Sequence, residues 1–444
     1  MNALPHLLIE PGDSAVRIGD DALPIRGRAY ALLLALARNA GEIVSVRDLM
    51  DRVWPDRRVD EANLRNKINM LRRALGDVIL NVPGRGYVLV APVAIAGRAP
   101  MIAPPLVPML GRTGDAARLD AALGRDRFVT ITGPGGVGKS MLARACLGAV
   151  QAPLIVDLAE VGKPDELLPT LAAALDLPHS AGHAHVSAAL NHAANLIVFD
   201  NCERLAGTVA ALAGALFVEL PTLGILATSR QPLRAHGETC LALAPFPVPE
   251  TDAVPDLDRW ENSAAVRLFR DRFAACGGHG EITRDALRMV LNTCRALDGL
   301  PLAIELAAML AATHGLAVMP VLRADSLGVL TGGQRSAPAR HRSLRATVEH
   351  SHDLLSPHER IVFRRLAALP PIFAMADAEM AMGPSHVAQD IAQALVGLAA
   401  KSCLIADGDA GRPVYRLPET MRSLAALKLR EAGEWSLLEA GMRR

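Results

Sequence analysis

The chain has 444 residues, of which 51% are hydrophobic and 21% are charged, and its formal net charge at pH 7 is +1. A chain of this length can hold about three domains, and the large apolar fraction excludes a mostly disordered protein. The near-neutral balance excludes nucleic-acid binding through a general excess of positive charge, so such a partner would have to meet a local basic patch.

The spacing of the cysteines and the N-terminal sequence indicate the cellular compartment of the protein. The six cysteines are scattered, without a Cys-x-x-Cys pair, which favours reduced thiols in a cytoplasm over a disulfide framework or a zinc finger. Residues 1–6 lack a basic region followed by an apolar core, so no signal peptide is expected. These features predict a cytoplasmic protein.

Residues 1–95 predict a separate domain in which short strands precede helices. β-like segments are expected at 7–9, 15–18 and 22–25. A helix is expected near 28–39, and Ser45 is expected to cap a second helix over 46–53. Asp60 is expected to cap a third helix, which reaches Leu75.

The third helix of this domain has two different faces. Leu64, Ile68, Leu71 and Leu75 recur at helical spacing and predict one buried stripe. The candidate DNA-binding residues on the other face are Asn63, Arg65, Asn66, Lys67, Asn69, Arg72 and Arg73. Asn and Arg read base edges, and Lys and Arg contact phosphates. On charge alone, a solvated helix surface is the favoured interpretation.

This region resembles the winged helix-turn-helix domain of the OmpR/PhoB type. The motifs that carry the resemblance are Gly41-Glu42-Ile43-Val44-Ser45, Val53-Trp54-Pro55, Leu71-Arg72-Arg73 and Pro83-Gly84-Arg85-Gly86-Tyr87. The resemblance implies that helix 63–73 enters the major groove of double-stranded promoter DNA and that Arg85 lies on a wing near the minor groove. Members of that family often carry Arg where this chain has Met70 and Pro83.

Residues 88–110 are mostly apolar, with Arg98 as the single charge. The prolines of this stretch are Pro92, Pro100, Pro104, Pro105 and Pro108. They would break a membrane helix repeatedly and leave backbone groups unsatisfied in lipid. We therefore interpret the stretch as a stiff interdomain linker, with a membrane span as the alternative.

Residues 133–140 read Gly-Pro-Gly-Gly-Val-Gly-Lys-Ser, between an apolar β-like run at 128–132 and a helical segment. This context is typical of a phosphate-binding P-loop, and a merely tight turn is the alternative. Lys139 would reach the β- and γ-phosphates, and the Ser140 hydroxyl would bind Mg²⁺. The candidate nucleotide-binding residues here are Gly133, Gly135, Gly136, Val137, Gly138, Lys139, Ser140 and Met141.

Two further apolar strands end in polar residues. The run 196–199 is followed by Asp200, the candidate second Mg²⁺ ligand, and by Glu203, a candidate catalytic carboxylate. The run 224–227 leads to Arg230, which could sense the γ-phosphate or form only a surface ion pair. Three such strands separated by helices predict a parallel α/β sheet with its ligand groups at one edge.

The central part of the chain resembles the STAND (NB-ARC-like) nucleotide switches. The motifs are Leu110-Gly111-Arg112, 133–140, 196–203, Thr228-Ser229-Arg230 and 299–308, followed by weaker matches at 341–355 and 395–422. The resemblance implies ATP or ADP with Mg²⁺ as ligands, Arg112 near the base and Pro301 against adenine. Many members carry a second acid where this chain has Asn201, so hydrolysis is expected to be slow or absent.

Six histidines are predicted not to bind a metal ion. His179, His183 and His185 are interpreted as solvent-exposed loop residues, and His350, His352 and His358 as residues of a helical surface. No carboxylate or cysteine lies next to the first group in the sequence to complete a metal site.

The predicted fold is multidomain α/β plus α+β. Its parts are a winged helix at 1–95, a Pro-rich linker at 96–108, a P-loop domain at 109–245, a helical lid at 246–345 and a winged-helix-like domain at 346–444. The predicted function is that of an ATP-dependent transcriptional regulator without membrane attachment. ADP would close the C-terminal lid, whereas ATP would open it and permit self-association on repeated DNA half-sites. RNA polymerase is a further candidate partner.

Two other classes of protein remain open at this point. One is an enzyme whose output is ATP-driven chemistry, and the other is a constitutive DNA-binding protein with a vestigial nucleotide site.

Overall fold

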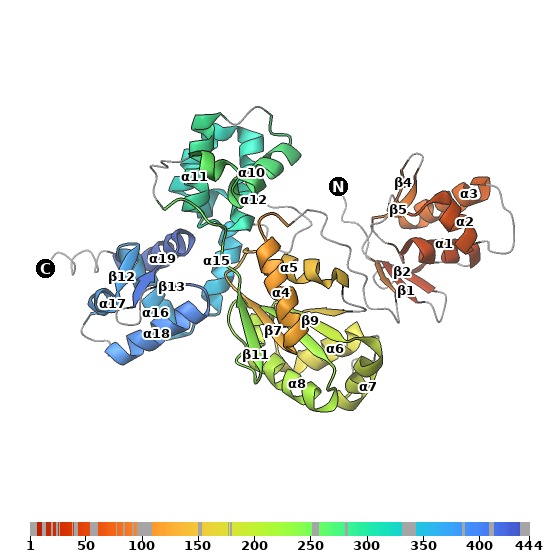
Figure 1. Ribbon diagram of the computed structural model, residues 1–444, viewed down its shortest axis with the longest axis horizontal. Coiled ribbons are helices and arrows are strands. Elements are labelled where there is room, and N and C mark those ends of the chain that lie inside the picture. Colours follow the sequence, from red (N-terminus) through yellow and green to blue (C-terminus); the bar gives the residue numbers. More distant parts are fainter. Residues whose placement is uncertain are drawn as a thin grey trace. The chain divides into compact units, whose positions relative to one another are not determined.

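Figure 1 shows the computed structural model of the chain. The structure describes residues 7–10, 15–18, 21–23, 25, 27–37, 39, 43–53, 61–76, 78–82, 85–90, 93–95, 109–149, 153–175, 177, 180–250, 257–279, 283–330, 343–383, 387–407 and 413–435. The chain divides into two compact units. The first comprises Met1–Val107, Leu147–Phe199 and Leu212–Ile225, and the second Pro108–Cys146, Asp200–Ala211 and Leu226–Arg444.

The N-terminal region begins with a small sheet of alternating apolar residues. Its strands are β1 (Leu7–Glu10), β2 (Ala15–Ile18), β3 (Asp21–Leu23) and β6 (Val93–Ile95), in the order β3-β2-β1-β6. β6 pairs parallel with β1, with Leu7 opposite Val93. The interpretation of 88–110 as a linker is therefore wrong for 88–89, which lie in strand β5 (Gly86–Leu89), and for 93–95, which pair with β1. The Pro-rich stretch 96–108 lies outside the described residues.

Three helices and a hairpin complete this region. They are α1 (Gly27–Ala37), α2 (Val46–Val53), α3 (Glu61–Leu75), β4 (Ile79–Val82) and β5 (Gly86–Leu89). The Ser45 hydroxyl accepts a hydrogen bond from the Asp48 amide at 3.1 Å, which confirms the predicted cap of α2. Leu64, Ile68, Leu71 and Leu75 are buried in one core with α1. The result is the predicted winged helix-turn-helix.

Close packing between the hairpin and the segment before α2 requires a glycine. Gly86 has a φ of +138°, and a Cβ at this position would lie 2.0 Å from the Val44 carbonyl oxygen. The Val44 amide donates to the Tyr87 carbonyl at 2.8 Å, and the Tyr87 amide donates back at 3.0 Å. Only glycine combines this backbone conformation with this approach.

The central sheet has five strands in the order β11-β7-β10-β9-β8 and is parallel. Its strands are β7 (Phe128–Thr132), β8 (Leu154–Asp157), β9 (Leu196–Asp200), β10 (Gly224–Ser229) and β11 (Glu238–Ala242). The accompanying helices are α4 (Thr113–Arg125), α5 (Lys139–Ala145), α6 (Leu167–Ala174), α7 (His183–Ala193) and α8 (Ala206–Glu219). β7 and β9 are buried along their whole length, as a sheet covered on both faces requires.

Helices follow the sheet along the chain. The first group comprises α9 (Leu257–Glu261), α10 (Ala264–Ala275), α11 (Arg284–Ala296), α12 (Pro301–His314), α13 (Met319–Ala324) and α14 (Ser326–Val329). The second group comprises α15 (Leu344–Asp353), α16 (Pro357–Arg365), α17 (Met375–Met382), α18 (Ala388–Ala400) and α19 (Glu419–Glu431). A three-stranded antiparallel sheet of β12 (Ile372–Ala374), β14 (Val414–Arg416) and β13 (Ile405–Asp407) accompanies the second group.

Short 3₁₀ helices connect several of these elements. They are η1 (Cys146–Ala149), η2 (Pro164–Glu166), η3 (Cys202–Arg204), η4 (Leu316–Val318) and η6 (Leu366–Ala368). None of the helices in the described ranges combines the length and the hydrophobicity that a bilayer span requires. His183 and His185 lie in α7, so their interpretation as loop residues is wrong, while His179 lies outside the described residues.

Candidate nucleotide site and DNA interface

The loop between β7 and α5 has the backbone that a phosphate cradle needs. Gly133, Gly136 and Gly138 have positive φ angles, and a Cβ on Gly133 would lie 2.6 Å from the Leu243 carbonyl oxygen. The amides in the first turn of α5 lack intrahelical partners, as at every helix N-terminus. The loop and the helix together can therefore present several N–H groups to one anion.

Lys139 and Ser140 open helix α5. The Lys139 ammonium donates to the carbonyl oxygens of Gly133 and Pro134 at 2.8 and 2.9 Å, so it lies close against its own loop. Val137 is fully buried, whereas the Met141 side chain is 40% exposed. The Lys139 ammonium, which would neutralise phosphate charge, is thus held at the loop by backbone carbonyls.

A carboxylate and two hydroxyl groups meet at the ends of the strands. The Ser140 hydroxyl donates to one oxygen of Asp200 at 2.7 Å, and the Thr228 hydroxyl donates to the same oxygen at 2.5 Å. Arg144 lies 3.4 Å from the other oxygen of this buried carboxylate. Hard oxygen ligands are what Mg²⁺ prefers, so Ser140 and Asp200 fit the predicted metal. Sequence reasoning missed Thr228, although its place at the tip of β10 was a signal.

Glu203 is a buried carboxylate next to this group. Its Oε1 lies 3.3 Å from Nε of Arg230 and 3.4 Å from Nε2 of His350. Burial tends to raise the pKa of Glu203, but the His350 hydrogen bond and the charges of Arg230 and Lys139 outweigh it and lower the pKa to about 2. Oε2 is buried without a hydrogen-bond partner, so this oxygen has capacity to accept from a bound water or ligand.

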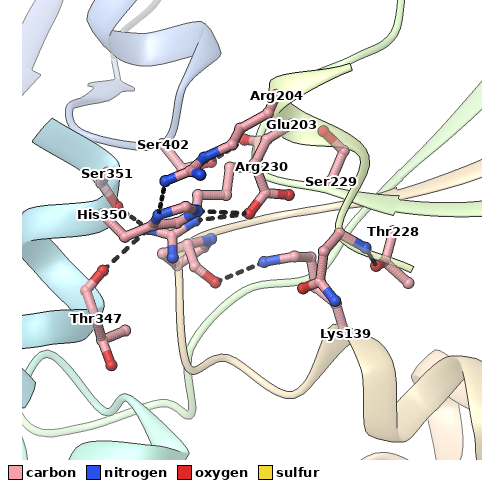
Figure 2. Close-up of polar contacts among 12 residues, drawn as sticks. Lys139, Glu203, Arg204, Thr228, Ser229, Arg230, Thr347, His350, Ser351 and Ser402 are labelled. Carbon is pink, nitrogen blue, oxygen red and sulfur yellow. Dashed lines mark hydrogen bonds and ion pairs between the residues drawn. The ribbon is translucent and has the colours of Figure 1, made fainter. Parts of the chain in front are cut away.

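Arg230 contacts helix α15 and Glu203, as Figure 2 shows. Its guanidinium donates to the Thr347 carbonyl at 3.1 Å and to the Ser351 hydroxyl, both on α15. The Ser402 hydroxyl donates to the Arg230 carbonyl at 2.9 Å. Arg230 is only 3% exposed, so the alternative of a surface ion pair is wrong.

The guanidinium of Arg230 also lies against the phosphate loop. A Cβ on Gly135 would approach both of its terminal nitrogens and Cγ2 of Thr347 to 2.9 Å. Because Gly135 has no side chain, Arg230 and Thr347 of α15 can pack closely against the loop. A side chain in that space would push the arginine away from the position at which it could contact a phosphate.

His350 is not a residue of an exposed helical surface, so that interpretation is wrong. Its side chain is 14% exposed, and Nδ1 lies 3.3 Å from the Arg204 guanidinium. Thr347, His350 and Ser351 share one face of α15, at spacings of three and four residues. The spacing was visible in the sequence, but it does not say whether that face is covered.

Arg112 contacts the loop through its side chain, and Pro301 precedes a residue that contacts the loop through its backbone. The Arg112 guanidinium donates to the carbonyl oxygens of Val137 at 3.0 Å and Ala244 at 2.8 Å, and lies 4.7 Å from the Phe246 ring centroid. Pro301 is the first residue of α12, and the next amide, that of Leu302, donates to the Gly136 carbonyl at 3.1 Å. The structure thus brings Arg112 into contact with the loop, and it places Pro301 next in sequence to Leu302, which contacts it.

A second long-range contact involves Asp298, which sequence reasoning missed. Its carboxylate accepts hydrogen bonds from the amides of Glu419 and Thr420 at 2.8 Å each, and from the Thr420 hydroxyl at 2.6 Å. These are the first residues of α19, so Asp298 caps a helix that lies far away in the sequence. Burial raises the pKa of Asp298, against the lowering effect of the Thr420 hydrogen bonds.

The candidate DNA-binding residues lie on α3 and beside the hairpin. Asn63, Arg65, Asn66, Asn69, Arg73 and Arg85 are exposed, and Lys67 is partly exposed. Arg72 differs, because its Nε donates to the Ile79 carbonyl of β4 at 2.8 Å. Part of its side chain therefore connects α3 to the hairpin. The remaining residues leave a polar outer face opposite the buried leucine stripe.

Comparisons with known protein families agree with these two regions. Residues 20–89 match the family described as "Transcriptional regulatory protein, C terminal", and residues 122–233 match the "AAA domain" family. The Walker-type ATPase PABY2304 of Pyrococcus abyssi resembles 71% of the chain, and the match covers 95% of that protein, with 17% identity and a TM-score of 0.51. This likeness supports the fold.

Two relatives come from Mycobacterium tuberculosis strain H37Rv. "Putative HTH-type transcriptional regulator Rv0890c" is 36% identical over 325 residues, which are 71% of this chain and 35% of that protein. This chain therefore spans about a third of the length of that relative. "Uncharacterized protein Rv0894" is 32% identical over 343 residues, which are 74% of this chain and 83% of that protein.

Proposed function

We propose that this chain is a transcriptional regulator switched by a nucleotide. It belongs to the family of these mycobacterial proteins and joins an OmpR/PhoB-type regulator domain to an AAA domain. Its resemblance to the STAND switches is part of this proposal. The winged helix would bind promoter DNA, and the P-loop region would bind ATP or ADP with Mg²⁺. The C-terminal helices would respond to which nucleotide is bound.

One observation carries this proposal. Arg230 lies against Gly135 of the phosphate loop, pairs with Glu203 and donates to Ser351 of α15. The side chain that is available to a γ-phosphate is therefore also the side chain that holds α15. A ligand can change the protein's state only if it interacts differently with the two states, and Arg230 supplies such a difference.

The residues would act as follows. Lys139 would donate to the β- and γ-phosphates, and Ser140 and Asp200 would hold Mg²⁺, which neutralises phosphate charge when bound. With ATP, Arg230 would turn from Glu203 toward the phosphate and would release Thr347 and Ser351. With ADP, Arg230 would keep its contacts with α15, and the C-terminal helices would stay closed. The opened form would self-associate and place several winged helices on repeated half-sites.

The test is DNA binding by the full chain. Fluorescence anisotropy on the upstream region of the neighbouring operon would be measured with ADP, ATP and a non-hydrolysable ATP analogue, for the wild type and Lys139→Ala. We expect tighter and more cooperative binding with ATP or its analogue, and loss of that difference in Lys139→Ala. Salt dependence of the affinity would verify phosphate contacts.

Two results would favour the other classes of protein. Equal DNA binding under all nucleotides would favour a constitutive DNA-binding protein with a vestigial nucleotide site. Rapid ATP turnover without salt-sensitive DNA binding would favour an ATP-driven enzyme. The missing carboxylate at Asn201 argues against rapid turnover.

A further inference from the structure

Met70 is a large hydrophobic side chain on the outer face of α3, where it is 40% exposed. Residues three and four positions apart are neighbours on a helix surface, so Met70 lies beside Asn66, Lys67, Arg73 and Ala74. Asn66, Arg73 and Ala74 are exposed, and Lys67 is partly exposed. Met70 therefore belongs to the surface that would contact DNA, and packing in the hydrophobic core does not explain a large apolar side chain at this position.

The polar residues around Met70 are two amides, Asn63 and Asn66, and two cations, Lys67 and Arg73. Asn63 and Asn66 are exposed and lie one to two turns before Met70 on the same side of the helix. The Nε of Arg72 donates to the Ile79 carbonyl of the hairpin, so part of that side chain is already engaged within the domain. Among the neighbours of Met70, Arg73 is the one guanidinium.

Groove chemistry limits what these side chains can read. In the major groove, Asn pairs bidentately with N6 and N7 of adenine, whereas Arg pairs with O6 and N7 of guanine. The thymine C5-methyl group is the apolar feature that a base pair presents there. A thioether offers only a weak hydrogen-bond acceptor, so the feature that Met70 complements is this methyl group.

We propose that α3 reads an A·T-rich half-site, in which Met70 contacts the C5-methyl group of a thymine and Asn63 and Asn66 pair with adenines. The inference rests on the DNA binding proposed above and adds the base composition of the target. It also gives Met70 a specific part in recognition, at a position where a guanidinium would favour guanine.

The experiment replaces thymine by deoxyuridine, which removes the methyl group and keeps the base pairing. The full chain would first select its site from a random duplex pool, and each thymine of the selected half-site would then be replaced in turn. We expect an A·T-rich half-site with one thymine whose replacement weakens binding about three- to fivefold, the effect of exposing roughly one methyl group. Met70→Ala should bind the thymine and deoxyuridine duplexes equally.

Two further variants keep the result interpretable. Met70→Leu retains an apolar side chain and should still distinguish thymine from deoxyuridine. Met289→Ala changes a methionine of similar exposure on α11, 37% exposed, and should also keep the discrimination. Circular dichroism would verify that each variant is folded.

The outcomes separate this inference from the proposed function. A G·C-rich selected site, a wild type indifferent to every replacement, or discrimination that persists in Met70→Ala would each overturn the role of Met70 while DNA binding stands. Failure of the wild type to bind any duplex would instead overturn the proposed DNA binding, and this inference with it.

Discussion

The two candidate binding surfaces differ in how their side chains are engaged. At the nucleotide site Lys139, Asp200 and Arg230 all have protein partners, and Arg230 is buried against α15. On α3, Asn63, Asn66 and Met70 are exposed at the surface. A nucleotide would therefore have to displace internal contacts, whereas DNA would meet side chains that are already exposed. This difference supports our proposal of regulation at the nucleotide site and recognition by α3.

The largest expected effect comes from removing Arg230. In Arg230→Ala the buried carboxylate of Glu203 loses its arginine, which should cost about 3–5 kcal/mol of unfolding free energy. Urea unfolding followed by circular dichroism would measure the loss. The control is Arg270→Ala, whose partner Glu261 is half-exposed, so the expected cost is about 1 kcal/mol or less. Equal losses in the two variants would contradict the account of a buried pair.

The second prediction concerns nucleotide affinity. Lys139→Ala removes a cation at the phosphate loop and should weaken ATP binding about 10- to 100-fold, since a hydrogen bond to a charged group contributes roughly 1.5–3 kcal/mol. Isothermal titration calorimetry would measure the change. Lys163→Ala, at an exposed lysine before η2, should bind like the wild type. A loss below twofold in Lys139→Ala would mean that the loop does not hold the phosphates.

The third prediction concerns the contact between Asp298 and α19. Asp298→Ala removes three acceptor contacts from the first turn of α19 and should destabilise that helix by about 1–2 kcal/mol. Hydrogen exchange should then increase in Glu419–Glu431. Asp377→Ala is the matched control. Asp377 accepts from the Ala374 amide at 2.8 Å at the start of α17, so its removal should leave hydrogen exchange in α19 unchanged. Unchanged exchange in α19 would mean that Asp298 is not its cap.

The fourth prediction concerns the dependence of stability on pH. The pKa of Glu203 is lowered from 4.5 to about 2, so ionised Glu203 stabilises the folded state above about pH 4.5 and loses this contribution as the pH falls toward 2. The stability difference between the wild type and Glu203→Gln should therefore shrink over that interval. Urea midpoints at several pH values would measure it. A difference that does not change with pH would show that the Glu203 charge does not stabilise the protein.

The sequence predicted those features that depend on neighbours along the chain. The strand Phe128–Thr132, the helix Val46–Val53 and the Ser45 cap were all predicted, because apolar periodicity and capping residues act over a few positions. The P-loop glycines were also visible, since their spacing is fixed by the phosphate cradle.

Contacts between distant segments could not be predicted in this way. Arg230 and Ser351 are 121 positions apart, and Asp298 and Thr420 are 122 apart. Helical spacing places Thr347, His350 and Ser351 on one face, but only the fold determines that Glu203 and Arg230 cover it. Because the sequence does not show that this face is covered, it predicts an exposed His350.

We propose that Arg230 couples the bound nucleotide to α15. Hydrogen exchange of the amides in Leu344–Asp353 is the most direct test of this coupling. The full chain would be compared with ADP and with a non-hydrolysable ATP analogue, after binding of both has been verified. We expect faster exchange in α15 with the ATP analogue than with ADP, and no such difference in Lys139→Ala. Equal protection of α15 with both nucleotides in the wild type would contradict this coupling.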